Sequence, residues 1–342
     1  MLKVVTLCSG YDSQCLALER LKEIDSDFDY ELLAWSEIDS YVIKAHDALF
    51  PKWKGRNLGD MTICDYSSIE KDVDLLFYST PCQSLSSAGK QKGMRKGDDA
   101  ASSLIWHTER AIRELSPKIL ILENVGAILN KRNINDFNQW MSVLSSYGYR
   151  NFYALLNSKD YGIPQNRERL FLVSIKDGPD YAFGDSVELK RKFKDLLERD
   201  VSPVYYLPDD KVKAFMDAYD NSDDSEYSES KVIILGKYSP NSAICGRVMS
   251  FNGLAPTIMA GTHGYAFGTF LESYEEGKIR RLTPRECFRL MGLRENEIDI
   301  LMSQGFSDTQ MYKMAGNSIV VDCLVNGIFK TLFIENNKTA LF

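Results

Sequence analysis

The chain has 342 residues, 44% of them hydrophobic and 26% charged, with a formal net charge of −7. These values are typical of a globular protein long enough for one large domain and a smaller one. No uninterrupted apolar run reaches the ~18 residues that a membrane-spanning helix needs, so the sequence argues against a membrane protein. The seven cysteines are an odd number without paired spacing, which favours reduced thiols and a cytoplasmic location. No Cys-x-x-Cys pair or histidine cluster predicts a metal site.

Short apolar runs alternate with segments of helical spacing through residues 1–176. The predicted strands are Val4–Cys8, Leu32–Trp35, Val73–Tyr78, Ile119–Leu122, Phe152–Leu156 and Leu170–Ile175. The predicted helices between them are Tyr41–Phe50, Ser103–Leu115 and Phe137–Tyr147. This alternation predicts a doubly wound, Rossmann-like α/β domain with a mostly parallel sheet.

The periodicity breaks after this domain. Residues 178–275 are rich in Asp, Ser, Gly, Tyr and Pro, which indicates a smaller, irregular domain. Regular structure resumes in residues 280–342, where Thr283-Pro-Arg-Glu286 has the pattern of a capping box. A final helix from about Ser318 to Phe333 is apolar on most faces, so we expect it to pack back and complete the first domain.

Candidate ligand-binding residues follow the first two predicted strands. They lie at the carboxyl ends of these strands, which is where an α/β sheet binds its ligands. Gly10 allows a sharp turn after the first strand, and Glu37 follows the second, where an acid can accept hydrogen bonds from ribose hydroxyls. Asp60 could accept a hydrogen bond from an adenine amino group. No G-x-G-x-x-G or G-x-x-x-x-G-K-[ST] pattern is present. The pattern therefore favours a nucleoside ligand without a pyrophosphate.

Nucleophilic and acidic residues follow the next strands. Cys82 lies on a turn that leaves the third strand, and a thiolate there is a soft, potent nucleophile. Glu123 ends a very apolar strand and is a candidate proton donor. In Gln165-Asn166-Arg167-Glu168-Arg169, the arginines precede another strand and could reach the same cleft.

An ordered series of short motifs resembles that of the cytosine-5 DNA methyltransferases. In chain order the motifs are Pro81-Cys82-Gln83, Glu123-Asn124-Val125, Gln165-x-Arg167-x-Arg169, Arg281-Leu-Thr-Pro-Arg-Glu286 and Gly316-Asn317-Ser318. The resemblance covers residues 1–176 and about 247–333, and the middle region corresponds to the family's variable target-recognition domain. It implies that a methyl group passes from S-adenosylmethionine to carbon 5 of a flipped-out cytosine in double-stranded DNA.

The resemblance also implies a role for individual residues. The catalytic set is Cys82 as nucleophile, Glu123 on the ring nitrogen and amino group, and Arg167 on the base carbonyl, with Gln165 and Arg169 beside them. The cofactor set is Ser9, Gly10, Glu37, Ile38, Asp60, Met61, Pro81, Leu104, Asn317 and Ser318. The DNA-binding set is Ser84, Lys90, Lys92, Arg95, Lys96, Arg247 and Thr257.

The sequence departs from the family at two places. Tyr11-Asp12-Ser13 replaces further glycines, and Asp12 would repel a methionine carboxylate. Ser79-Thr80 stands where a glycine often precedes the Pro-Cys pair. A second basic cluster, Arg280, Arg281 and Arg285, is a further candidate DNA contact, although Arg280 and Arg281 could instead pair with Glu276 or Glu286.

Other functions stay open at this point. One is the tRNA-methylating branch of the same family. The middle region of roughly 100 residues favours DNA instead, because reading the bases of a duplex requires an element that enters a groove. Another is a catalytically inactive nucleic-acid-binding relative, and a small-molecule methyltransferase is a third. The expected setting is bacterial or phage DNA modification by a monomer, with a restriction enzyme as candidate partner and no membrane association.

Overall fold

The structure, a computed structural model, describes residues 1–69, 72–81, 101–217, 230–238, 246–260, 269–273 and 277–335. Cys82, Ser84 and the basic residues from Lys90 to Lys96 lie outside these ranges. The chain forms two compact units. Unit 1 contains Met1–Leu156, Glu168–Ser186 and the segment from Cys323, and unit 2 contains Asn157–Arg167 and Val187–Asp322.

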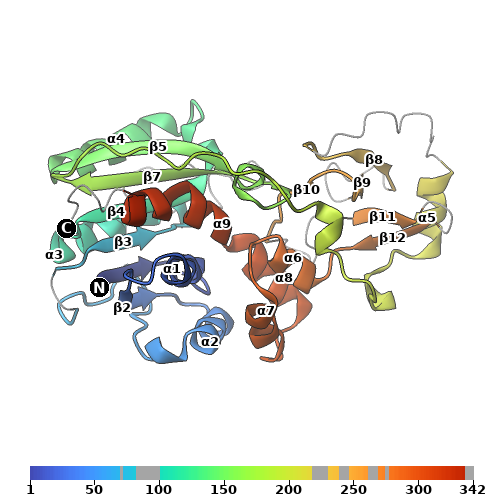
Figure 1. The fold of residues 1–342 in the computed structure, drawn as a ribbon, viewed down its shortest axis with the longest axis horizontal. Helices are drawn as coiled ribbons and strands as arrows, with labels where there is room; N and C mark the ends of the chain where they lie inside the picture. Colours follow the sequence, from blue (N-terminus) through green and yellow to red (C-terminus); the bar gives the residue numbers. More distant parts are fainter. Residues whose placement is uncertain are drawn as a thin grey trace. The chain divides into compact units, whose positions relative to one another are not determined.

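In the described residues, unit 1 is built on a six-stranded sheet with the order β2-β1-β3-β4-β7-β5 (Figure 1). The strands are β1 (Leu2–Leu7), β2 (Tyr30–Ser36), β3 (Leu75–Tyr78), β4 (Ile119–Val125), β5 (Tyr149–Asn157) and β7 (Glu168–Lys176). Strands β1 to β4 pair in parallel, and β7 runs antiparallel to β4. The predicted α/β fold with a mostly parallel sheet is confirmed.

Helices cover both faces of this sheet. They are α1 (Ser13–Ile24), α2 (Ser40–Leu49), α3 (Thr108–Leu115) and α4 (Ile134–Ser146), joined by the short 3-10 helices Pro51–Trp53, Ala101–His107, Gly126–Leu129 and Ser158–Tyr161. On one face, Leu76 and Leu120 pack with Ile112 of α3 and Trp140 of α4. Alternate strand residues such as Phe77 point to the opposite face, which α1 helps to cover.

The closing segment is helical but not one straight helix. It consists of α8 (Asp308–Asn317), α9 (Val321–Leu324) and the π-helix η8 (Val325–Glu335). By length and composition alone Asp308–Glu335 could cross a membrane, yet 61% of its apolar window is buried in the structure. Helix η8 packs against α1, and the ring of Phe333 lies 5.9 Å from that of Phe28. These contacts are those of a core helix.

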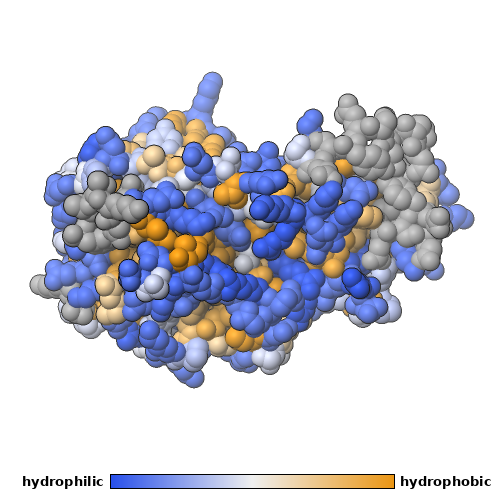
Figure 2. Space-filling model, viewed as in Figure 1, coloured by the Kyte–Doolittle hydropathy of each residue, from blue (hydrophilic) through white to orange (hydrophobic). Residues whose placement is uncertain are grey.

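The surface agrees with this interpretation. On the face seen in Figure 2, hydrophilic side chains dominate and apolar ones form separate patches. Large exposed hydrophobic side chains include Ile38 and Ile63, which are 72% and 80% exposed. Scattered exposure of this kind is normal for a globular protein.

Unit 2 contains more regular structure than the sequence predicts. A four-stranded sheet has the order β12-β11-β9-β8, and β6 pairs in parallel with β10. The strands are β6 (Gln165–Asn166), β8 (Ile234–Lys237), β9 (Arg247–Ser250), β10 (Ala255–Pro256), β11 (Thr269–Ser273) and β12 (Lys278–Arg281). The helices are α5 (Asp209–Met216), α6 (Pro284–Arg289), α7 (Glu295–Met302) and α8, with 3-10 helices at Phe193–Leu196 and Pro203–Tyr205.

The compact units divide the chain differently from the three predicted segments. Helices α6 to α8 belong to unit 2, so only the chain from Cys323 onward returns to unit 1. The predicted capping box is confirmed, because Thr283 accepts from the backbone N–H of Glu286 and Glu286 accepts from that of Thr283. Whether residues 178–275 recognise the target stays a prediction.

Candidate active site

The carboxyl ends of four parallel strands of unit 1 carry the candidate site. Gly10 follows β1, Glu37 follows β2, and Ser79 to Pro81 follow β3. Glu123 lies near the end of β4, and the parallel pairing places all four ends at one edge of the sheet. The predicted convergence of Gly10, Glu37 and Glu123 is therefore confirmed, while Cys82 follows the last described residue of its segment.

Backbone amides hold the carboxylate of Glu37. Its Oε2 accepts from the N–H of Gly10 at 3.2 Å, and its Oε1 accepts from those of Ile38 and Asp39 at 2.8 and 3.0 Å. Gly10 has φ of +60°, a conformation that favours glycine, so the turn after β1 brings its amide to Glu37. The side chain of Glu37 is thus fixed in orientation but only half-buried.

The segment that carries Asp60 and Met61 runs beside the end of β2. The N–H of Leu58 donates to the carbonyl of Trp35 at 2.7 Å, and Ser36 Oγ donates to the carbonyl of Gly59 at 2.6 Å. Asp60 is exposed, and hydrogen bonds from Thr62 hold the pKa of its carboxyl below the usual range. Asp60 therefore remains an ionised acceptor at neutral pH.

Three other predicted cofactor residues have different environments. Ser9 is buried, and its N–H donates to the carbonyl of Ser36 at 3.1 Å. The side chain of Ile38 is largely exposed. Leu104 is half-buried in the 3-10 helix Ala101–His107.

Asp12, which the sequence placed near the cofactor carboxylate, points into the protein. It is fully buried at the start of α1, where its Oδ1 accepts from the N–H of Cys15 at 3.2 Å and its Oδ2 from the hydroxyl of Thr6 at 2.8 Å. Nε2 of His46, also fully buried, lies 3.7 Å from Asp12 Oδ2. The His46 ring stacks on Trp35 with centroids 3.7 Å apart. Nothing in the sequence pattern indicates this contact of His46.

Both carboxylate oxygens of Glu123 have partners. Ser79 Oγ donates to Oε2 at 2.6 Å, and Nε of Arg169 lies 3.4 Å from Oε1. Asn124 donates to the carbonyl of Thr80 at 3.3 Å, so the segment before Cys82 is tied to the end of β4. The motifs in the sequence do not identify Ser79 as a functional residue. One signal could have identified Ser79: it is a polar residue directly after a buried strand, and the neighbouring strand carries an acid.

Gln165 and Arg167 lie in unit 2 and bind backbone there. Arg167 is 3% exposed, and its guanidinium donates to the carbonyls of Ile258, Gly316 and Ser318 at 2.6, 3.0 and 2.8 Å. Gln165 is fully buried, donates to the carbonyl of Leu290 at 2.7 Å and accepts from the N–H of Ile258 at 2.9 Å. These contacts fix the end of α8 against the β10 segment.

The Gly316-Asn317-Ser318 motif ends a helix. The sequence predicts that the final helix begins at about Ser318, but Ser318 is the C-cap of α8, and its hydroxyl donates to the carbonyl of Ala315 at 2.8 Å. A Cβ on Gly316 would lie 2.2 Å from the backbone nitrogen of Ala260, so this close approach requires glycine. Asn317 is exposed and Ser318 is half-buried.

The predicted DNA contacts that the structure describes lie in unit 2. Arg247 begins β9, opposite Lys237 of β8. Thr257 is half-buried, and its hydroxyl donates to the carbonyl of Asn166 at 2.7 Å.

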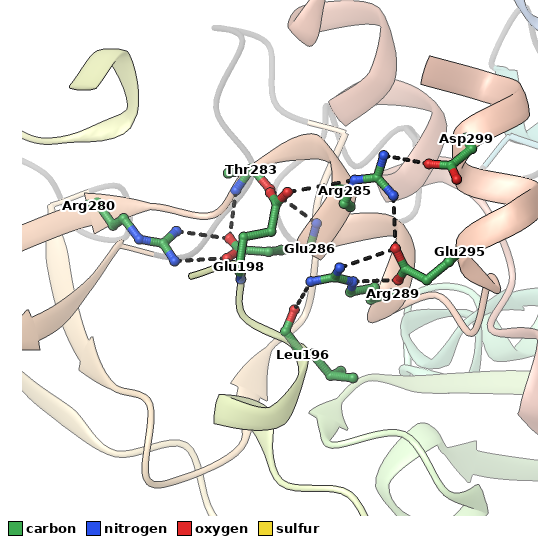
Figure 3. A network of polar contacts seen from close by, with 9 residues as sticks. All are labelled: Leu196, Glu198, Arg280, Thr283, Arg285, Glu286, Arg289, Glu295 and Asp299. Carbon is green, nitrogen blue, oxygen red and sulfur yellow. Dashed lines mark hydrogen bonds and ion pairs between the residues drawn. The ribbon is translucent and has the colours of Figure 1, made fainter. Parts of the chain in front are cut away.

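Two arginines of the second basic cluster, Arg280 and Arg285, pair with acids, as Figure 3 shows, while Arg281 donates to the carbonyl of Val204 at 2.8 Å. Arg280 makes two hydrogen bonds to Glu286 at 2.8 and 2.9 Å, with both side chains fully buried. Arg285 pairs with Glu295 at 2.8 Å and Asp299 at 2.6 Å. Arg280 and Arg285 therefore belong to a structural network, and the alternative that Arg280 pairs with Glu286 is confirmed.

Comparison with known proteins assigns the family. The family model described as C-5 cytosine-specific DNA methylase matches residues 2–333. The chain is 33% identical over 318 residues to the Type II methyltransferase M2.ScrFI of Lactococcus lactis subsp. cremoris, covering 92% of this chain and 81% of that protein. It is 30% identical to the Type II methyltransferase M.HhaI of Haemophilus parahaemolyticus, covering 94% and 92%.

The fold has a counterpart among solved structures. The Entamoeba histolytica methyltransferase EhMeth aligns with a TM-score of 0.72 at 17% sequence identity, covering 98% of each chain. With a family match that spans nearly the whole sequence, the chain belongs to the C-5 cytosine-specific DNA methylase family.

Proposed function

We propose that the chain transfers a methyl group from S-adenosylmethionine to carbon 5 of a cytosine within a specific sequence of duplex DNA. The observation that carries this proposal is the edge of the parallel sheet in unit 1. There Gly10 and Glu37 form one hydrogen-bonded pair, and Ser79 and Glu123 form another. A nucleoside-binding acid and a candidate proton donor thus share the edge at which α/β sheets bind ligands.

The residues at this edge fit an adenosine-bearing cofactor. Glu37 would accept from the ribose hydroxyls, Asp60 would accept from the adenine amino group, and the exposed side chain of Ile38 would contact the adenine ring. The carboxylate of Asp12 is buried and accepts from Thr6 and Cys15, so it would not contact the cofactor directly. When bound, S-adenosylmethionine supplies an electrophilic methyl group.

The protein must make carbon 5 of the base nucleophilic. The Cys82 thiolate forms a bond to carbon 6, and Glu123 gives a proton to the ring nitrogen, so that an enamine with a reactive carbon 5 results. After methylation, water takes the proton from carbon 5, and its electron pair re-forms the ring double bond as the bond between sulfur and carbon 6 breaks. The ring nitrogen returns its proton to Glu123, and the Cys82 thiolate is restored.

Arg169 is the arginine best placed to hold the carbonyl oxygen of the base. The sequence assigned this role to Arg167, but the guanidinium of Arg167 donates to three backbone carbonyls. Arg169 lies against Glu123, and its side chain is 18% exposed. A donor there would stabilise negative charge on the base oxygen as the adduct forms.

Access to carbon 6 requires that the cytosine leave the duplex, at a cost of a few kcal/mol. We propose that residues 178–275 recognise the sequence and that the loop containing Ser84 and Lys90 to Lys96 meets phosphates. The enzyme would act as a cytoplasmic monomer in bacterial or phage DNA modification, with a restriction enzyme as candidate partner.

An assay with labelled S-adenosylmethionine tests the substrate. The purified protein is incubated with duplex DNA or with tRNA, and the nucleosides are separated after hydrolysis. We expect labelled 5-methylcytosine from DNA alone. Label in tRNA alone would identify the tRNA-methylating alternative, and label in neither, with DNA still bound, would identify an inactive relative.

A further inference from the structure

The register of two strands places Ser79 beside the candidate catalytic acid. In the pairing of β3 with β4, Tyr78 lies opposite Leu122, so the next residues, Ser79 and Glu123, are neighbours. The N–H of Ser79 donates to the carbonyl of Leu7 at 3.3 Å, which fixes its backbone to the end of β1. Its hydroxyl donates to Glu123 Oε2 at 2.6 Å, at the short end of the range for O–H···O hydrogen bonds.

The other oxygen of the same carboxylate forms an ion pair with Arg169. In the antiparallel pairing of β4 with β7, Arg169 lies opposite Val125, two residues from Glu123. Its Nε lies 3.4 Å from Glu123 Oε1. The Glu123 side chain is only 9% exposed, so water has little access and the two protein donors determine its rotamer.

We infer that Ser79 is a positioning residue that holds the Glu123 carboxylate in the orientation needed to contact the target base. The inference rests on the proposed function and identifies a residue that the family's motif series leaves out. Glycine or alanine at this position would leave Oε2 without its side-chain donor, and Arg169 alone would not define the rotamer. The hydroxyl adds no reacting group, so its effect passes through Glu123.

Ser79→Ala tests this role, and Ser174→Ala provides a matched control. Ser174 is a fully buried serine of β7 whose hydroxyl also makes a 2.6 Å side-chain hydrogen bond, to Asn151. The single-turnover methylation rate is measured with saturating DNA, together with the Kd for S-adenosylhomocysteine and the melting temperature. We expect Ser79→Ala to lower the rate ~10-fold, a typical effect of one hydrogen bond to a charged group, with the Kd unchanged. Ser174→Ala should keep the wild-type rate.

Two further variants separate positioning from simple loss of packing. Ser79→Thr keeps the hydroxyl and should retain most of the rate. In a Glu123→Gln background, Ser79→Ala should have little additional effect, because both changes act on one interaction. A wild-type rate in Ser79→Ala, or the same ~10-fold loss in both backgrounds, would overturn the inference. If Ser79→Ala does not fold, Ser79→Cys replaces it with the same expected result.

The outcomes distinguish this inference from the proposed function. If the wild-type protein methylates neither DNA nor tRNA, the proposed function fails and the role of Ser79 fails with it. If the wild-type protein methylates DNA and Ser79→Ala does so equally fast, only the role of Ser79 is wrong.

Discussion

Two cysteines follow neighbouring strands, and the surroundings of one of them rule it out as the nucleophile. Cys8 follows β1, and its Sγ lies 3.3 Å from the sulfur of Met61. Burial raises the pKa of the Cys8 thiol to about 12, and the nearby charges of Glu37 and Asp60 act in the same direction. Cys8 is therefore a neutral thiol at pH 7, and Cys82 remains the candidate nucleophile.

Exchange of each cysteine for serine tests this distinction. Cys82→Ser should abolish methyl transfer while cofactor and DNA still bind, because a hydroxyl is a far weaker nucleophile than a thiolate. Cys8→Ser should remain active. Transfer assays and binding titrations on both variants provide the check, and turnover near the wild-type rate in Cys82→Ser would contradict the assignment.

Glu37→Ala tests the cofactor site at the same scale. Loss of a charged acceptor should weaken binding of S-adenosylmethionine by about 1.5–3 kcal/mol. Glu31→Ala is the control, since Glu31 lies at the opposite end of β2 and pairs with Arg56 at 2.9 Å. Calorimetry that gives equal affinities for the two variants would mean that the ribose is held elsewhere.

Residues at strand ends could be predicted, but the directions of side chains could not. Glu37 and Glu123 were found because each follows or ends an apolar run. The sequence did not reveal that Asp12 turns inward to Thr6, because its conformation, φ +69°, is one that L residues seldom adopt. Arg167 lies in the break between β6 and β7, whereas Arg169 lies within β7, so the two side chains make different contacts. The sequence shows only that the two arginines are two residues apart and does not indicate the break.

At the scale of elements, the buried pair of Arg280 and Glu286 joins β12 to α6. Glu286→Gln should lower the free energy of unfolding by about 3–5 kcal/mol, since it leaves the Arg280 charge buried without its full partner. Glu295→Gln is the control, because its side chain is 55% exposed, and it should cost less than about 1 kcal/mol. Urea unfolding measures both, and equal losses would show that burial does not decide the strength of these pairs.

The strands of unit 1 were predicted, and the short strands of unit 2 were not. The six strands of unit 1 correspond to apolar runs. Strands β8, β9 and β12 have four residues each, too few to show an alternation. The start of α6 was predicted from its capping box, whereas α8 was missed and its end was interpreted as the start of the next helix.

At the scale of the whole molecule, specificity and catalysis should be separable. Exchange of residues 178–250 for the matching region of a relative should change which cytosine is methylated and leave the affinity for S-adenosylmethionine intact. Contacts to base edges discriminate by about 1–3 kcal/mol each, which is enough to redirect the enzyme. If the methylated sequence stayed the same, target choice would have to lie outside this region.

The most direct test of the central claim is a map of 5-methylcytosine in DNA from cells that express the chain. Sequencing that distinguishes 5-methylcytosine from cytosine should find the modification at one recurring short sequence with the wild-type protein. Cells that express Cys82→Ser at the same level should show none. Absence of 5-methylcytosine with the wild-type protein, or an equal amount with Cys82→Ser, would contradict the account.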